Sequence, residues 1–259
     1  MNRFLGGACV LVFALCTGVT AFAGDFKGFY VGGNVGGANG NSIGAQTSTI
    51  FSPTGYFATT SVPAIATTGS QKLGPGGFTG GGQAGYNIQH LWFVLGFEVD
   101  YGVMNMTDKK SGTTKYPCCN ANFTVTQFAG TSWLFTARPR IGFTGGPLLV
   151  YGTGGLAVTN YEYTALFTDT FATAREGFRT ENNQNGWAAG AGVEFKRGKH
   201  WGWKGEYLRA SFSGGASTHT STNLTTSIAP FAFPSNVFTH SVGDLGGANI
   251  YRFGFNYHF

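Results

Sequence analysis

The amino-acid sequence predicts an all-β protein, an eight-stranded antiparallel up-and-down transmembrane β-barrel. Along eight segments the side chains alternate between apolar and polar, as in strands with lipid on one face and a lumen on the other. The connections between these segments are alternately short and long, a regularity that a soluble β-sandwich does not require. Beyond the N-terminal region, no apolar run has the length of a transmembrane helix. The expected strands are 27–38, 78–89, 92–104, 132–143, 148–160, 185–197, 201–212 and 248–259.

The last segment, 248–259, is the one around which this prediction is organised. Aromatic side chains occupy every second position up to the final residue, namely Tyr251, Phe253, Phe255, Tyr257 and Phe259. The other parity is mostly polar and contains Ile250, Arg252, Gly254, Asn256 and His258. Successive side chains of a strand point to opposite faces. We therefore expect the aromatic face to meet lipid and the polar face to meet the lumen.

The first three segments show the same alternation. In 27–38 and 78–89, apolar and aromatic residues share one parity, while amides and glycines are common on the other. Segment 92–104 has the cleanest alternation in the interior of the chain. There Glu98 and Asp100 lie opposite a face made of Phe93, Leu95, Phe97, Val99, Tyr101 and Val103.

The next four segments carry more irregularities. The parity of 132–143 continues on both sides of Pro139, so we expect a strand although proline lacks an amide donor. Segment 148–160 is rich in glycine, and the sequence does not assign its two faces. In 185–197 and 201–212, tryptophans and other apolar residues lie opposite charged ones.

The connections fall into two classes. Those after the second, fourth and sixth segments are two to four residues long. The others are long and rich in Ser, Thr, Asn, Gly and Ala, with few charges, which is typical of loops that face solvent. The sequence therefore predicts four long loops, at 39–77, 105–131, 161–184 and 213–247.

The N-terminus predicts a signal peptide, residues 1–23, followed by a barrel domain, residues 24–259. Arg3 precedes an apolar stretch, and Ala21-Phe22-Ala23 forms a small-x-small cleavage site. Removing Arg3 leaves 16 − 1 = 15 basic residues against 11 acidic ones, a net charge of +4. So mild a charge, without a basic stripe, indicates no nucleic-acid partner.

Several motifs resemble a known family in the order in which they occur. They are GFYVGGN (28–34), GGGQAGYN (80–87), GFEVDY (96–101), YGTGGLA (151–157) and KGEYL (204–208), followed by the terminal Phe259. Together they resemble small eight-stranded OmpA-type barrels, and more closely the alphaproteobacterial outer-membrane immunogenic or porin-family proteins. The resemblance implies the cell outer membrane as location, contact with its lipid and lipopolysaccharide, and recognition of the last strand by the barrel-assembly machinery.

The polar parity carries charges of both signs. An eight-stranded barrel is just wide enough for side chains to fill its interior, and buried charges must be paired there. We therefore expect an ion-pair network in the lumen, with Glu98 and Asp100 facing Arg138 and Arg140 on the neighbouring strand. Its predicted members are Glu98, Asp100, Arg138, Arg140, Glu194, Lys196, Lys204, Glu206 and Arg252. A structural plug is the favoured role, and a narrow solute path is the alternative.

The sequence offers no constellation for catalysis, a metal or a cofactor. The spacing of Glu98 and Asp100 follows from strand alternation, so we do not interpret it as a glycosidase pair. The histidines are scattered without the spacing of metal ligands. Cys118 and Cys119 are adjacent, and either a strained vicinal disulfide or two free thiols would fit.

Three hypotheses for function follow. The leading one is a non-enzymatic outer-membrane barrel with short periplasmic turns, four long extracellular loops, and a structural and surface-antigen role. The second is a narrow or gated pore for small solutes. The third is an adhesin or receptor whose loops bind a host component or a small molecule such as haem.

Overall fold

The computed structural model describes residues 25–227 and 236–259. The predicted signal peptide lies outside the described residues. No helix in the described part is long and apolar enough to span a membrane.

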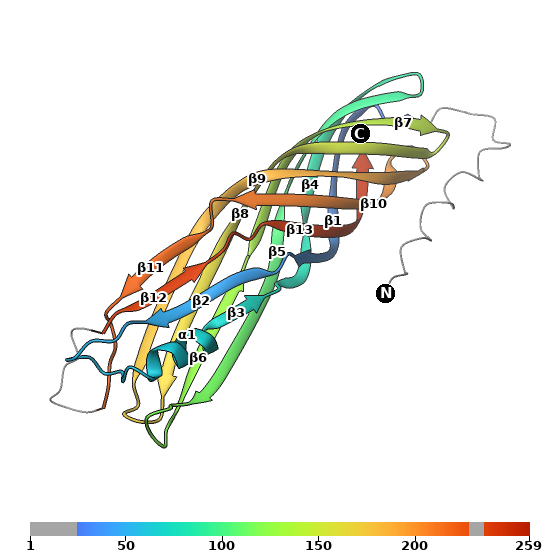
Figure 1. Cartoon of the computed structure of the whole chain (residues 1–259). Helices are drawn as coiled ribbons and strands as arrows, with labels where there is room; N and C mark the ends of the chain where they lie inside the picture. Colours follow the sequence, from blue (N-terminus) through green and yellow to red (C-terminus); the bar gives the residue numbers. More distant parts are fainter. Residues whose placement is uncertain (1–24, 228–235) are drawn as a thin grey trace, which may run out of the picture.

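Eight antiparallel strands form a closed ring (Figure 1). Each pairs with the next, and the last pairs with the first, so the ring has no open edge. The predicted fold class is therefore confirmed. The ring strands are β1 (Gly28–Gly40), β4 (Gly76–His90), β5 (Phe93–Lys115), β7 (Trp133–Gly145), β8 (Leu148–Asp169), β9 (Arg175–Arg197), β10 (Trp201–Ser213) and β13 (Gly247–His258).

Strand β7 runs through Pro139, as the unbroken parity predicted. The ladder between β7 and β8 has partners at Ala137–Leu156 and again at Arg140–Thr153. Between them, Pro139 has no amide to donate. Its carbonyl instead accepts a hydrogen bond from the Thr153 hydroxyl at 2.8 Å.

The long connections are largely folded, so the prediction that they are loops is wrong for much of their length. Strands β5, β8 and β9 continue beyond the ring, and β6 (Asn122–Gly130) pairs with β5 and β8. A separate sheet has the strand order β11-β12-β2-β3. It is made of β2 (Ile43–Thr49), β3 (Ser70–Leu73), β11 (Ser217–Ser221) and β12 (Phe238–Val242), and is accompanied by helix α1 (Ser61–Thr68). We call this part, with the extensions of β5, β8 and β9, the head; it lies at the end of the barrel away from the C-terminus (Figure 1).

The head forms because the alternation of small polar and apolar residues continues there. Along β6, Phe123 and Val125 point inward and are fully buried, while the intervening threonines face outward. The outer hydroxyls pair across strands, Thr113 with Thr124 at 2.9 Å and Ser111 with Thr126 at 2.8 Å. These short polar residues give the segments a loop-like composition although their pattern is that of strands.

The ring exposes apolar side chains on its outside and hides charge on its inside. Monomeric soluble proteins rarely expose apolar patches larger than a few hundred Å². Side chains between 40% and 61% exposed surround the ring, including Phe29, Val35, Phe78, Tyr86, Ile88, Leu95, Phe97, Tyr101, Val103, Ile141, Phe143, Val150, Leu156, Trp187, Val193, Phe195, Trp201, Trp203, Tyr207, Tyr251, Phe253 and Phe255. Such a belt fits contact with lipid.

The interior of the ring is layered. Its end with the short turns, called the turn end here, contains the charged residues. Nearer the head lies a layer of buried apolar side chains, among them Met104, Leu134, Leu208 and Ile250. At the turn end, a small cluster is formed by Phe26, Val94, Leu149 and Tyr151. The lumen is thus filled by side chains along its length.

Candidate functional site

A network of buried charges fills the ring near the turn end. Its four carboxylates belong to Glu98, Asp100, Glu194 and Glu206, and its four cations to Arg138, Arg140, Lys204 and Arg252. All eight side chains are at most 3% exposed. Formal charge within this set is balanced, which buried ions require.

Glu98 is the centre of the network. One of its carboxylate oxygens accepts from Arg138 at 3.0 Å, and both accept from Lys204, at 2.9 and 3.0 Å. The Tyr30 hydroxyl donates to the second oxygen at 2.8 Å. Arg140 lies 3.7 Å from that oxygen. The register explains part of this arrangement, because Glu98 and Arg138 are direct cross-strand partners on β5 and β7.

The two arginines of β7 connect separate sides of the lumen. Arg138 contacts Asp100 at 3.0 Å and Glu206 at 3.3 Å in addition to Glu98. Arg140 contacts Glu194 at 3.4 Å. Its guanidinium carbon also lies 4.4 Å above the ring of Tyr30, a cation–π contact. Both arginines therefore hold several strands together across the interior.

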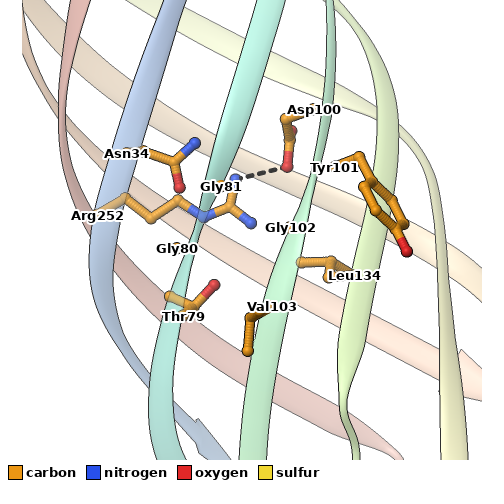
Figure 2. Close-up of a pocket in the computed structure, with 10 residues that line it drawn as sticks. All are labelled: Asn34, Thr79, Gly80, Gly81, Asp100, Tyr101, Gly102, Val103, Leu134 and Arg252. Carbon is orange, nitrogen blue, oxygen red and sulfur yellow. Dashed lines mark hydrogen bonds and ion pairs between the residues drawn. The ribbon is translucent and has the colours of Figure 1, made fainter.

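Arg252 brings the closing strand into the same network. Its Nη1 atom donates to Asp100 at 2.9 Å (Figure 2). Gly81 and Gly102 are cross-strand partners beside this pair. A Cβ atom at Gly81 would lie 2.5 Å from the Cα atom of Gly102, so only glycine permits the close approach of β4 and β5.

Lys196 is the one predicted member that the structure does not bring into the network. Its ammonium donates to the carbonyl of Asp25 and lies 5.4 Å from the ring centre of Phe26. Phe26 itself is fully buried, and its amide donates to the Gln89 side chain at 2.8 Å. The Asn87 amide donates to the Phe26 carbonyl at 2.8 Å. The segment before β1 thus closes the turn end of the ring.

Sequence reasoning missed several partners of the charged residues. Tyr151 donates to Glu206 at 3.0 Å. Asn256 donates to Glu194 at 3.0 Å, and His258 Nε2 lies 2.7 Å from the same oxygen. Asn256 and His258 lie in the lumen, as the polar parity of the last segment predicted, and Tyr30 falls on the polar parity of its strand. The carboxylates with which they pair were not predicted.

The aromatic residues of the last strand face outward. Tyr251, Phe253, Phe255 and Phe259 are between 47% and 69% exposed, while Arg252 and His258 are buried on the inner side. This is the division of faces that strand alternation produces.

A buried carboxylate organises the tip of the head. Asp169 Oδ2 accepts hydrogen bonds from the hydroxyls of Tyr56 at 2.6 Å and Tyr116 at 3.0 Å. Its Oδ1 accepts from the backbone amides of Ala172 at 3.3 Å and Ala174 at 2.9 Å. Burial and the neighbouring Asp169 raise the pKa of both tyrosines well above the ordinary value, so both remain hydrogen-bond donors.

Cys118 and Cys119 lie beside this carboxylate as two thiols. Their Sγ atoms are 2.9 Å apart, and the Ser61 hydroxyl lies 3.6 Å from Cys118 Sγ. The hydrogen bond from Cys119 lowers the pKa of Cys118. The same bond raises the pKa of Cys119 to about 11. Cys118 is therefore the more acidic thiol and the better nucleophile near neutral pH.

This asymmetry gives a test by alkylation. In the folded, reduced protein, iodoacetamide is expected to modify Cys118 before Cys119 at pH 7. Because the pKa of Cys118 is lowered, its labelling should reach half its maximal rate at a lower pH in the folded protein than in the urea-unfolded chain. Peptide mass spectrometry at several pH values measures both rates, and the urea-unfolded chain, in which the preference should vanish, is the control. Faster labelling of Cys119 would contradict the assignment.

A buried hydroxyl, imidazole and carboxylate lie in line inside the head. Thr47 Oγ1 is 3.1 Å from His240 Nδ1, and His240 Nε2 is 3.0 Å from Glu176 Oε2. Hydrolases use groups of these types in this order. Here all three residues are at most 1% exposed, and His240 stacks on Phe178 at 5.5 Å. These contacts join β2 and β12 of the separate sheet to β9.

A closed ring with an apolar outer belt and a charge-paired lumen defines a bacterial outer-membrane β-barrel. The chain belongs to the outer membrane protein β-barrel domain family, which matches residues 8–259. It is accordingly a protein of the outer membrane.

The chain is similar to curated outer-membrane proteins and aligns with solved structures. It is 36% identical over 143 residues to the 31 kDa outer-membrane immunogenic proteins of Brucella melitensis and Brucella suis, covering 54% of this chain and 56% of each relative. The chain thus spans about half the length of the curated relatives it matches. Among solved structures, Ail, the attachment invasion locus protein of Yersinia pestis, aligns with 12% identity and a TM-score of 0.34, over 90% of this chain and 99% of Ail. The outer membrane protease OmpT from Escherichia coli aligns with 9% identity and a TM-score of 0.34, over 88% of this chain and 97% of OmpT.

Proposed function

We propose that this protein is a closed, non-conducting barrel that anchors a folded head at the cell surface. The observation that carries the proposal is the filled lumen. Phe26 closes the turn end, the balanced ion pairs fill the next layer, and apolar side chains fill the layer below the head. A water-filled path would need open polar space along the axis. The recess beside Arg252 and Asp100 in Figure 2 has an accessible volume near 0 Å³, which is too small for a water molecule.

The orientation follows from the lengths of the connections. Barrels of this class have short turns toward the periplasm and long segments toward the outside. The turns after β4, β7 and β9 would then be periplasmic, and the head extracellular. A folded head presents a defined surface to antibodies, which suits an antigen. The immunogenic relatives in Brucella agree with this role.

Two sets of partners are part of the proposal. The apolar belt on the outer face of the ring would contact the lipid and lipopolysaccharide of the outer membrane. The outward aromatic residues of β13 would be recognised by the barrel-assembly machinery, as the family resemblance implies. Truncation after Tyr257, which removes His258 and Phe259, tests the second contact, because it should lower the amount of barrel inserted in the membrane.

Single-channel recording in planar bilayers tests the closed barrel. The purified, reconstituted protein is expected to give no discrete conductance steps under an applied voltage, whereas a trimeric porin in the same bilayers gives them. Insertion is verified on an unboiled gel, where a folded barrel migrates differently from the boiled chain. Reproducible steps from inserted protein would overturn the proposal and support the gated pore instead.

A further inference from the structure

An aromatic pocket lies at the tip of the head. The pocket has a volume of about 200 Å³. Three chain segments far apart in sequence build it: the segment before α1 with the first residue of that helix, the turn between β5 and β6, and the turn between β8 and β9. Its lining consists of Tyr56, Phe57, Ala58, Ser61, Tyr116, Cys118, Cys119 and Phe171.

The walls of the pocket are held in place from behind. Phe57 packs edge-on against Phe167 and Phe238, with ring centres 5.5 Å apart in each pair. Tyr56 and Tyr116 direct their hydroxyls to Asp169, as described above, so they offer ring carbon rather than free hydroxyls. Preformed walls lower the entropy that a ligand must lose on binding.

The lining is mostly aromatic carbon and sulfur, with the Ser61 hydroxyl beside Cys118. None of the described residues that line the pocket carries a carboxylate, ammonium or guanidinium group. Ligand sites are typically lined by apolar and aromatic side chains with a few polar groups. An anionic ligand would lose hydration here without finding a cationic partner, which costs several kcal/mol.

We propose that this pocket binds a small, uncharged aromatic molecule of one or two fused rings, stacked among Tyr56, Phe57 and Phe171. The size is consistent, because an apolar cavity of about 150 Å³ accommodates benzene. Aromatic pairs are stabilised by about 0.5–1.5 kcal/mol beyond the area they bury. This ligand role goes beyond the display of a surface antigen, and it does not depend on whether the ring conducts ions.

Cys118 at the rim provides a reporter for the test. The protein carrying Cys119→Ser is reduced, placed in lipid nanodiscs and treated with iodoacetamide, with and without indole as the uncharged probe. Saturating indole is expected to slow alkylation of Cys118 about ten-fold, because the bound rings would cover the sulfur. Ligand-observed NMR on the same sample should show saturation transfer to indole.

Matched variants distinguish this pocket from general adsorption. Phe171 and Phe51 are both exposed at the head, at 59% and 49%, but only Phe171 lines the pocket. With each variant compared with its own rate without indole, Phe171→Ala should lose the protection, and Phe51→Ala should keep it. Indole-3-carboxylate, similar in shape but anionic, should protect at least ten-fold less well at equal concentration.

Three results would overturn the proposal. They are alkylation unaffected by indole, equal protection by the anion, and full protection in Phe171→Ala. None of these results changes the outcome expected in the conductance experiment. The ligand site and the closed barrel are therefore tested independently.

Discussion

Replacing Arg138 by alanine is expected to lower the free energy of unfolding by about 3–5 kcal/mol, the range for breaking a buried ion pair. The Nη2 atom of Arg138 lies within 3.3 Å of carboxylate oxygens from Glu98, Asp100 and Glu206. Without Arg138, the four buried carboxylates of the network share three cations, Arg140, Lys204 and Arg252. The network then carries a net negative charge. The loss is large because the carboxylates cannot regain the hydration that they gave up on folding.

Urea titration in lipid vesicles, monitored by tryptophan fluorescence and unboiled gel mobility, measures this loss. Arg179→Ala is the matched control, because Arg179 also pairs with a glutamate, at 3.1 Å, but its side chain is 64% exposed. An exposed pair contributes about 0–1 kcal/mol. If Arg138→Ala shifted the urea midpoint no more than Arg179→Ala does, the lumen network would not stabilise the ring.

A second pair of variants separates charge from packing. Arg138→Met retains much of the side-chain volume without the charge. The double variant Arg138→Met/Glu98→Gln also removes one carboxylate charge. The double variant restores charge balance and should recover part of the stability lost in Arg138→Met. Conductance of Arg138→Ala in bilayers is informative as well: silence favours a structural plug, whereas current would identify a latent path along the lumen.

The strands of the ring and the faces of their side chains could be predicted because both depend on local alternation. Lipid on one side and a small lumen on the other force a period of two on each strand. Glu98 and Arg138 could also be brought together, because they lie on consecutive segments of an up-and-down barrel, and consecutive strands of such a barrel are neighbours. The partners that were missed lie further along the chain. Tyr30 falls on the polar parity of its strand, but its hydrogen bond to Glu98 spans 68 positions in the sequence.

The head was missed for a different reason. Its strands alternate like those of the ring, with Tyr161, Tyr163 and Phe167 buried at every second or fourth position of β8. Most of their outward neighbours are polar, namely Glu162, Thr164 and Thr168, because they face solvent and not lipid. The composition is therefore that of a loop, and only the period of two, extended past Asn105 and Asn160, could have revealed the strands.

Phe26 and the aromatic pocket were beyond prediction by pattern. Phe26 precedes β1, and its amide bonds to Gln89, 63 positions away. The pocket joins residues from three segments whose approach depends on how β6, β8 and the second sheet pack. In both cases a tertiary contact, and not a local period, determines the position of the side chain.

Replacing Asp169 by alanine is expected to loosen the head while leaving the ring intact. The change would leave the hydroxyls of Tyr56 and Tyr116 and the amides of Ala172 and Ala174 without their acceptor. A buried donor without a partner costs about 1–3 kcal/mol. Water at the tip offsets part of this, so we expect a local loss of about 3 kcal/mol.

Hydrogen exchange with mass spectrometry measures the effect segment by segment. Amides of β6 and of the β5 extension should exchange about 100-fold faster in Asp169→Ala, whereas amides of β10 and β13 in the ring should not change. Asp108→Ala is the matched control, because Asp108 accepts a single exposed bond, from the Gly74 amide at 2.7 Å. The local response is expected because the ring has its own closed ladder and its own ion pairs, and the apolar layer near Met104 separates them from the tip. Equal acceleration in β13 would mean instead that head and ring unfold as one cooperative unit, and the tip could then not be altered without loss of the barrel.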